Sequence, residues 1–406
     1  MAAVAGLRGS GDWAADERPK DFRSMILWRN PNGDAPLTAL LSRAAKDKPA
    51  DPEFFWWDEP NDIVRLQTAT TVNSTATTLT VDSEDPDETN PGRVWGHATH
   101  LKEGDLLLVE KTETAAYDNE LVMVSSVTSS TSFTVKRGVA GTTPAAINED
   151  TFLTHIGSAY AEGTGAPPAA SRNPLKYSNM CQIFKDIYDI TNTAKGITNL
   201  RTGDVLKNEK MRKAFDHARG IEQAIMWGQK HEDTGPNGKP RRFTGGIRSF
   251  IPANRTTIFT TTPTVNTFLD SVYPAFDFNT PAGDQRVVFC GNGALNSINK
   301  MAKEDGQIQF DEVVKVYGMN LRRYILPQGE LYLRTHPLFN RHGRFAYSMV
   351  GVDFSALRWR PFRDTKTKDN IQNNDEDRSA GQWLTEAGLE VRYGGLSLFY
   401  LGNVVV

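Results

Sequence analysis

A short glycine-containing turn is the part of the chain whose spacing comes nearest to a chemical motif. Cys290-Gly291-Asn292-Gly293 follows an apolar run and opens a segment with helical periodicity, which is the setting of a dinucleotide-binding loop. Asn296 stands where that fingerprint has its third glycine, and the chain contains no P-loop motif. The pattern therefore favours a plain strand-to-helix turn, and an enzyme that uses Gly291 to Gly293 is the alternative.

Residues that could bind a metal ion are present, but their spacing is poor. None of the seven histidines forms an H-x-x-x-H pair, and the best candidates are His97 and His100, in a predicted loop beside Asp105. The acidic run from Asp82 to Glu88 lacks the glycine and the final glutamate of a calcium loop. It predicts a solvated turn, with a divalent ion at a subunit contact as the alternative. We predict no resident metal, no cofactor and no catalytic residue.

Composition and charge disfavour several classes of protein. The chain has 406 residues, 39% of them hydrophobic, and its 46 basic and 49 acidic side chains give a net charge of -3. A protein that neutralises nucleic-acid phosphates is usually basic over its domain, so tight DNA binding is disfavoured. No apolar stretch approaches the ~20 residues of a membrane span. Cys181 and Cys290 lie far apart and predict two buried, reduced thiols.

Four consecutive aromatic residues, Phe54, Phe55, Trp56 and Trp57, are predicted to lie on a strand. Successive side chains of a strand point to opposite faces, so both faces of this one must be covered. That requirement favours a position between two layers or between two subunits. Because the chain has no evident chemical site, contact with copies of itself is the economical use of its surface. We take these four residues as candidate subunit-contact residues.

The first half of the chain contains a distinct β-rich region. Residues 1–30 mix glycine, alanine and charges and predict an extended arm, and residues 36–45 predict a short helix. From about residue 62 to 156, threonine, serine and valine dominate. Strands are predicted there at 77–81, 106–109, 121–124 and 132–135. The composition predicts that this region is a small all-β insertion and that a flexible linker at 159–172 follows it.

The second half mixes helices and strands. The strongest helix is predicted at 204–230, where Met211, Phe215, Ala218, Ile221 and Ile225 recur at helical spacing. Gly235 and Gly238 are expected to end it. Further helices are predicted at 265–272 and 294–302, strands at 255–262, 286–290, 312–317, 321–325, 330–334 and 345–352, and a mostly β tail at 383–406. The chain is predicted to be α+β.

A set of short motifs along the chain resembles the major capsid protein family of tailed bacteriophages with the Hong Kong 97-like fold. In order, they are Pro36 to Leu41, Asp51 to Phe54 leading to Trp56-Trp57, Gln182 to Lys185, the RRFTGG sequence ending at Gly246, Phe289 to Gly291, Tyr332-Leu333 leading to Thr335 to Leu338, Arg360 to Thr365, and Thr385 to Arg392. The matches span residues 24 to 393, and the family has no catalytic motif to transfer.

The resemblance implies a domain layout. An N-terminal arm would comprise residues 1–30, and an extended β-hairpin loop, enlarged by the β insertion, residues 62–160. The peripheral domain would comprise residues 31–61, 161–263 and 351–406, with the helix at 204–230 as its spine. The axial domain would comprise residues 264–350 and carry a mixed sheet.

The resemblance also implies a function. The protein would be a non-enzymatic subunit that self-assembles into the hexamers and pentamers of an icosahedral head around a double-stranded DNA genome. Its partners would be itself, a scaffolding protein if one is used, a portal and a decoration protein, with weak non-specific contact to packaged DNA and no membrane. It would be assembled in the host cytoplasm and reside in the virion. The β insertion leaves a capsid decoration or tail structural protein as the alternative.

Overall fold

The structure is a computed structural model that describes residues 36–41, 46–59, 64–82, 98–110, 119–167, 174–196, 204–277, 280–305, 310–316 and 319–405. The described residues mix helices and strands, which confirms the predicted α+β class. The predicted arm, residues 1–30, lies outside them. The chain divides into two compact units: unit 1 comprises residues 1–33, 185–217 and 366–384, and unit 2 comprises the others.

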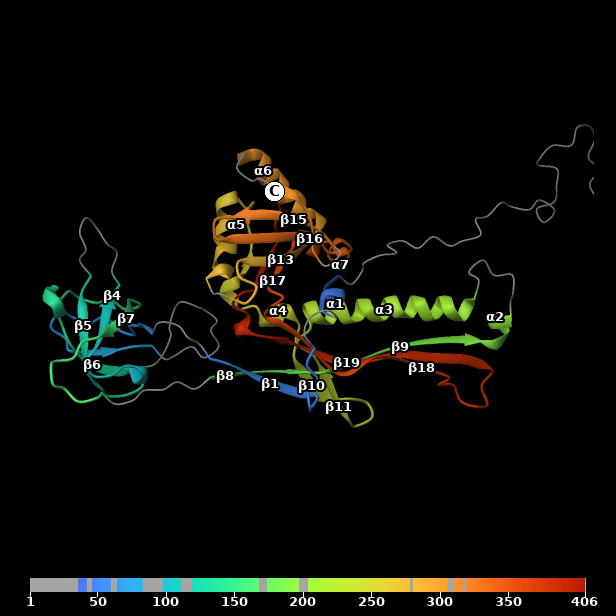
Figure 1. The fold of residues 1–406 in the computed structure, drawn as a ribbon, viewed down its shortest axis with the longest axis horizontal. Helices are drawn as coiled ribbons and strands as arrows, with labels where there is room; N and C mark the ends of the chain where they lie inside the picture. Colours follow the sequence, from blue (N-terminus) through green and yellow to red (C-terminus); the bar gives the residue numbers. More distant parts are fainter. Residues whose placement is uncertain are drawn as a thin grey trace, which may run out of the picture. The chain divides into compact units, whose positions relative to one another are not determined.

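The elements that these residues form are labelled in Figure 1 where there is room. The helices are α1 (Pro36–Leu41), α2 (Asn192–Gly196), α3 (Val205–Trp227), α4 (Ile247–Phe250), α5 (Val265–Val272), α6 (Asn292–Asp305) and α7 (Pro337–Asn340). Strands outside the large sheet and the barrel described below are β1 (Glu53–Asp58), β8 (Leu175–Met180), β9 (Gln182–Thr191), β10 (His231–Thr234), β11 (Pro240–Phe243), β18 (Leu357–Asp369) and β19 (Arg378–Val391).

A seven-stranded sheet organises the body of unit 2, in the order β12-β20-β17-β13-β16-β15-β14. Its strands are β12 (Thr256–Ile258), β13 (Gln285–Cys290), β14 (Phe310–Val316), β15 (Met319–Leu326), β16 (Gly329–Thr335), β17 (Met349–Val352) and β20 (Phe399–Gly402). The central strand β13 runs parallel to β16 and antiparallel to β17. β12 and β17 are shorter than the strands predicted at 255–262 and 345–352.

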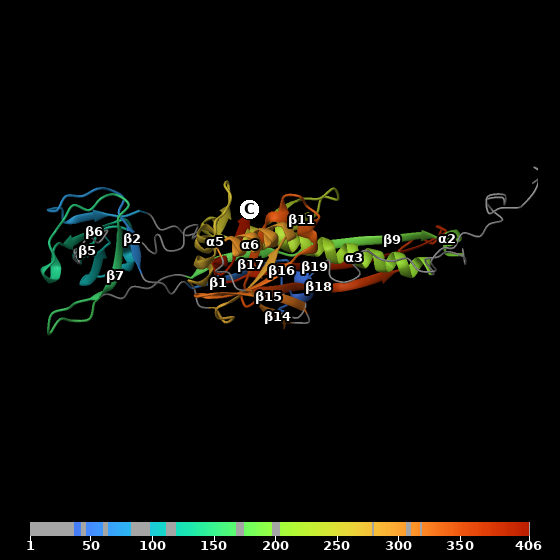
Figure 2. The same cartoon turned by 90° about the horizontal axis from the view of Figure 1, so that it is seen from above.

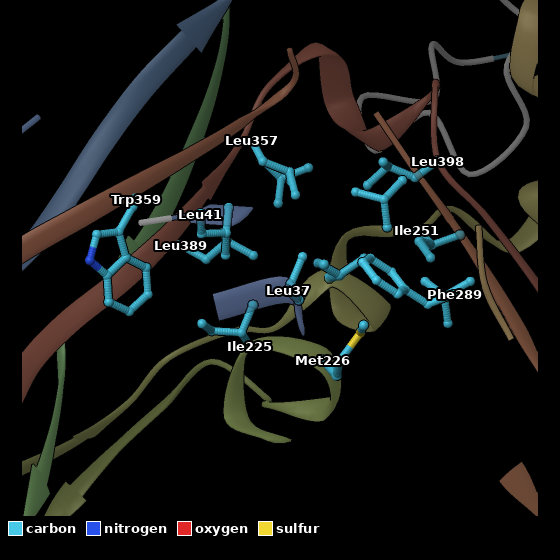
Figure 3. Packing of buried hydrophobic residues seen from close by; sticks show 14 of the residues in the cluster. Leu37, Leu41, Ile225, Met226, Ile251, Phe289, Leu357, Trp359, Leu389 and Leu398 are labelled. Atoms are coloured by element: carbon cyan, nitrogen blue, oxygen red, sulfur yellow. The ribbon is translucent and has the colours of Figure 1, made fainter. Parts of the chain in front are cut away.

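Both faces of this sheet are covered, because successive residues of a strand point to opposite sides. Val288 and Cys290 of β13 pack into one cluster with residues of α5 and α6. Phe289, between them, packs into a second cluster with Leu37 of α1 and Ile225 of α3, as the close view in Figure 3 shows. The body of unit 2 is therefore a three-layer arrangement with helices on each side of the sheet (Figure 1).

A fully buried carboxylate, that of Glu222 in α3, joins remote parts of unit 2. Its Oε1 accepts hydrogen bonds from the backbone N–H of Leu37 and from Nε2 of His336, each at 2.8 Å. The other ring nitrogen of His336, Nδ1, accepts from the backbone N–H of Leu338, so the ring proton lies on Nε2. One oxygen thus holds α1, α3 and the corner between β16 and α7 together.

Helix α3 confirms the predicted long helix, with shorter ends. Asp204 caps it, because its Oδ1 accepts a hydrogen bond at 3.1 Å from the backbone N–H of the third helical residue. The helix ends before Gly228, where a Cβ would lie 2.4 Å from a carbonyl oxygen of the segment after β11. The expectation that Gly235 and Gly238 end the helix is wrong. They lie in the turn of the β10–β11 hairpin, where the N–H of Gly238 donates to the carbonyl of Gly235.

Unit 1 combines polar contacts with a few buried apolar side chains, among them Tyr188, Ile190 and Leu384. It contains the first part of α3 and the adjoining parts of the three-stranded sheet β18-β19-β9, which run side by side in Figures 1 and 2. The indole Nε1 of Trp383 donates to the carbonyl of Lys210 at 3.0 Å, and Nδ1 of His217 lies 2.6 Å from a carboxylate oxygen of Asp186. Within the described part of the chain, every hydrophobic cluster lies in unit 2.

The apolar stripe predicted along α3 is therefore only half covered by the chain. Ile221 and Ile225 are buried in unit 2, whereas Met211 and Phe215 in unit 1 are 41% and 40% exposed. The helical periodicity is correct, but it does not reveal which half of the stripe the chain itself buries.

The described residues between 64 and 158 fold into a separate six-stranded sheet in the order β2-β7-β4-β5-β6-β3. Its strands are β2 (Arg65–Gln67), β3 (Thr78–Thr80), β4 (Asp105–Val109), β5 (Leu121–Val127), β6 (Ser132–Lys136) and β7 (Phe152–Ser158). β2 and β3 meet where Thr68 pairs with Val81, so the sheet closes into a barrel with its own core around Leu107 and Phe133. The four predicted strands correspond to β3, β4, β5 and β6, whereas β2 and β7 escaped prediction.

Replacing Glu222 should test the role of the buried carboxylate. In Glu222→Leu the donors of Leu37 and His336 lose their acceptor, and each unsatisfied buried donor costs about 1–3 kcal/mol. We expect the free energy of unfolding of the unassembled protein to fall by about 2–6 kcal/mol in chemical denaturation. Glu222→Gln keeps an acceptor oxygen and should lose less, so a leucine variant at least as stable as the glutamine variant would contradict this role.

Candidate assembly interface

The four candidate subunit-contact residues lie together on β1, and the structure separates them into two pairs. β1 pairs antiparallel with β8 to form a two-stranded ribbon, called here the β1–β8 ribbon. Phe54 and Trp56 are buried, whereas Phe55 is 46% and Trp57 is 60% exposed. This is the alternation that a strand imposes. The chain covers one face of the ribbon and leaves the other open to a neighbour.

Phe54 and Trp56 anchor the inner face of the ribbon to unit 2. The ring centroid of Trp56 lies 6.0 Å from those of Phe54 and Tyr177 and 5.9 Å from that of Phe250. Cys181 completes this cluster, and burial raises the pKa of its thiol to about 12. Both cysteines of the chain are buried and free, as the sequence predicted.

The fully buried side chain of Asn179 in β8 fixes the ribbon further. Its Nδ2 donates to the carbonyl oxygens of Gly245 at 3.0 Å and Leu389 at 2.6 Å. Its Oδ1 accepts from the backbone N–H groups of Gly245 at 2.7 Å and Met180 at 2.8 Å. The amide thus uses both of its donors and both of its acceptor positions. Four hydrogen bonds therefore fix the position of this residue of the ribbon against the segments that contain Gly245 and Leu389.

The open face of the ribbon presents Phe55 and Trp57 beside Lys176 of β8. The ammonium Nζ of Lys176 lies 3.9 Å from the ring centroid of Phe55 and 5.7 Å from that of Trp57. An ammonium group is attracted to the face of an aromatic ring, so Lys176 helps to hold both rings in place. The outer surfaces of the rings stay exposed. Neighbouring exposed aromatic side chains on a well-packed strand pair are typical of a surface that is buried against another chain.

The glycine turn after β13 is filled by the chain itself. A Cβ on Gly291 would lie 2.2 Å from the carbonyl oxygen of Ala346, and one on Gly293 would lie 2.7 Å from the ring of Tyr347. The N–H of Asn292, at the start of α6, donates to a side-chain oxygen of α7 at 2.6 Å. These glycines allow close packing of two segments. The space that a phosphate would need is occupied, so the geometry gives no support to the nucleotide-using alternative.

Those of the predicted metal candidates that the structure describes do not come together. Asp105 accepts a hydrogen bond from the backbone N–H of Lys102 at 2.7 Å and lies 3.5 Å from Nε2 of His155. No group of three His, Cys, Asp or Glu side chains among the described residues is arranged to hold a metal ion, His100 included. His97 and residues 83–88 of the acidic run lie outside them.

None of the helices formed by the described residues is long and apolar enough to cross a membrane.

Comparisons with known proteins identify relatives over nearly the whole chain. Residues 10–396 match the family model of the SU10 major capsid protein. The major capsid protein of Pseudomonas phage PaMx41 is 27% identical over 410 residues, covering 98% of this chain and 92% of that protein. Among solved structures, chains from Mycobacterium phage Bobi and Microbacterium phage Oxtober96 superpose with TM-scores of 0.47 and 0.44 at 7% and 10% identity. They cover 96% and 97% of this chain and 96% and 98% of their own lengths.

The two faces of the ribbon should respond differently to truncation. Trp56→Ala removes a buried anchor and should lower the free energy of unfolding of the unassembled protein by about 3–5 kcal/mol. Trp57→Ala removes an exposed ring and should change it by no more than about 0.5 kcal/mol. Chemical denaturation of both variants measures the difference. Equal losses of stability in the two variants would show that the outer face also supports the fold of the single chain.

Proposed function

Because the chain belongs to the SU10 major capsid protein family, and is a phage major capsid protein that assembles into capsid shells, we propose that its subunits form the hexamers and pentamers of an icosahedral head around a double-stranded DNA genome. The observation that carries this proposal is the β1–β8 ribbon. Its inner face is anchored by Phe54, Trp56 and Asn179, and its outer face exposes Phe55 and Trp57.

The ribbon has two means of contacting a neighbouring subunit. Its exposed aromatic face supplies apolar area, and buried aromatic residues contribute much of the binding energy of protein interfaces. In the described part of the chain β1 and β8 pair only with each other, so each has one edge without a strand partner. Such an edge can pair with an extended segment of another chain. Contacts of this head-to-tail kind close into rings.

We propose the Hong Kong 97-like domain layout for this chain. The arm comprises residues 1–30, the peripheral domain residues 31–61, 161–263 and 351–406, the extended loop residues 62–160, and the axial domain residues 264–350. Helix α3 supports the assignment of the spine. The range 264–350 contains β13 to β16 and the first half of β17, and β12 and β20 from outside it complete the same sheet.

The protein is part of the virion, and its further partners are proposals. They are a separate scaffolding protein, a portal, a decoration protein and weak non-specific contact with packaged DNA, in keeping with a net charge of -3. We propose that assembly takes place in the host cytoplasm and that the protein has no catalytic role. A decoration or tail protein is not favoured, because the family model and the phage relative both describe a major capsid protein.

Electron microscopy of the purified protein tests the arrangement of subunits. Closed shells or rings of five and six subunits, formed alone or with the phage's scaffolding protein, are the expected result. A protein that stays monomeric in both conditions would overturn the proposal of hexamers and pentamers.

The double variant Phe55→Ala/Trp57→Ala tests the proposed contact. It should keep the stability of the unassembled protein, because both rings are exposed. It should nevertheless form at least about tenfold fewer shells, since each 1.4 kcal/mol lost per contact is a factor of ten in association. Shell yield is measured by sedimentation and electron microscopy.

Ile156→Ala is a matched control for that variant, since Ile156 is 50% exposed on β7 of the barrel. It should assemble like the wild type. Normal shells from the double variant would show that the outer face of the ribbon is not a subunit contact.

A further inference from the structure

The turn of the β10–β11 hairpin contains an asparagine followed by a glycine, a pair whose side chain and backbone can react with each other. The chain has three such pairs, which begin at Asn32, Asn237 and Asn292, and the structure describes the last two. Asn237 and Asn292 are both exposed. The two described pairs therefore share residue types and exposure, and they differ in the backbone that holds them.

Asn237 lies in a tight turn that leaves room around the following glycine. The N–H of Gly238 donates to the carbonyl of Gly235 at 2.9 Å, and Gly238 has a φ of +71°. A Cβ built on Gly238 would meet no atom within 4 Å. The peptide nitrogen of Gly238 can therefore move toward the Asn237 side chain without displacing another segment.

The side-chain amide of Asn237 is already oriented for attack by that nitrogen. Its Oδ1 accepts a hydrogen bond from the backbone N–H of Lys239 at 3.2 Å. An asparagine that bonds to the backbone two residues ahead folds its side chain over the intervening peptide, which brings Cγ near the nitrogen of Gly238. The same N–H of Lys239 stabilises the negative charge that Oδ1 gains when a nucleophile adds to Cγ.

The hairpin is held closed by weak interactions. In the described part of the chain β10 and β11 pair only with each other, and an isolated two-stranded hairpin is marginally stable in water. Its cross-strand ion pairs, such as Asp233 with Arg241, join partly exposed side chains and add little stability. Opening of the turn frees the N–H of Gly238 from the carbonyl of Gly235, which the attack requires.

Asn292 has the opposite setting. It is the first residue of α6, and the side chains of a helix lean toward its N-terminus, away from the next peptide nitrogen. Its own N–H donates to Oδ1 of Asn340 at 2.6 Å. A Cβ on Gly293 would lie 2.7 Å from the ring of Tyr347, so the backbone there has no room to move.

We propose that Asn237 deamidates spontaneously in the folded protein, much faster than Asn292. The nitrogen of Gly238 loses its proton and bonds to Cγ of Asn237, the bond from Cγ to Nδ2 breaks, and Nδ2 leaves as ammonia. Water then opens the five-membered imide ring at either carbonyl, which gives aspartate or isoaspartate. The reaction consumes one water, releases one ammonia and adds one negative charge to the hairpin. It needs only the single chain, so it does not depend on the proposed assembly.

Peptide mapping of the unassembled wild-type protein by mass spectrometry tests this proposal. The protein is incubated at mildly alkaline pH in water labelled with heavy oxygen, because label in the product marks conversion that precedes the digestion. We expect Asn237 to convert at least about tenfold faster than Asn292, a ratio that corresponds to about 1.4 kcal/mol in activation free energy. No conversion at Asn237, or conversion no faster than at Asn292, overturns the inference.

Two controls separate the effect of the fold from that of the sequence. In guanidinium chloride the turn and the helix are both lost, so the two asparagines should convert at similar rates. An Asn292 that stays slow in the unfolded chain would contradict the structural cause. Asn237→Gln lengthens the side chain by one CH₂ and disfavours ring closure, so the label should disappear from that peptide and stay unchanged at Asn292. Label that persists in the hairpin peptide of this variant would show that Asn237 is not the reacting residue.

Discussion

A single buried carboxylate, that of Glu222, is the constraint on which the body of unit 2 depends. A carboxylate without solvent contact must find its hydrogen-bond donors within the protein. Two of them are the backbone N–H of Leu37 and Nε2 of His336, and they belong to elements that lie far apart in the sequence. The register of α1 against α3, and of α3 against the end of β16, therefore follows from the need to satisfy one oxygen, while the surrounding apolar cluster supplies the bulk of the stabilisation.

In the β1–β8 ribbon, too, a buried polar group fixes the position of a segment while apolar side chains supply the packing. Hydrophobic anchors fix one face, a fully satisfied amide fixes the strand position, and the opposite face is left free. Because successive side chains of a strand point to opposite faces, Phe55 and Trp57 must point outward when Phe54 and Trp56 pack inward. In the proposed contact, folding and assembly would use alternate residues of one strand, and a change in register by one residue would exchange the two roles.

Much of the fold could be predicted from the sequence, and the failures have identifiable causes. The strands of the large sheet and the helices α3, α5 and α6 carry clear periodicity. β2 and β7 were missed because one is only three residues long and the other contains Gly157 within a weakly alternating run. Gly228 was overlooked because its role is a close approach to residues after β11, which no local pattern encodes. The sequence predicts all four aromatics of β1 as contact residues, which stays a prediction, and their division into anchors and exposed rings needed the strand partner and the packing.

The packing of unit 1 bears on the stability of the free subunit. Its described residues contribute to no hydrophobic cluster, and Met211 and Phe215 remain exposed along α3. A neighbour that covers these side chains binds the folded form and not the unfolded one. The free energy of unfolding of this region is then a function of protomer concentration, by mass action. Local order in this part of the chain would be a collective property of the assembly, and dilution alone would weaken it without any change in sequence or solvent.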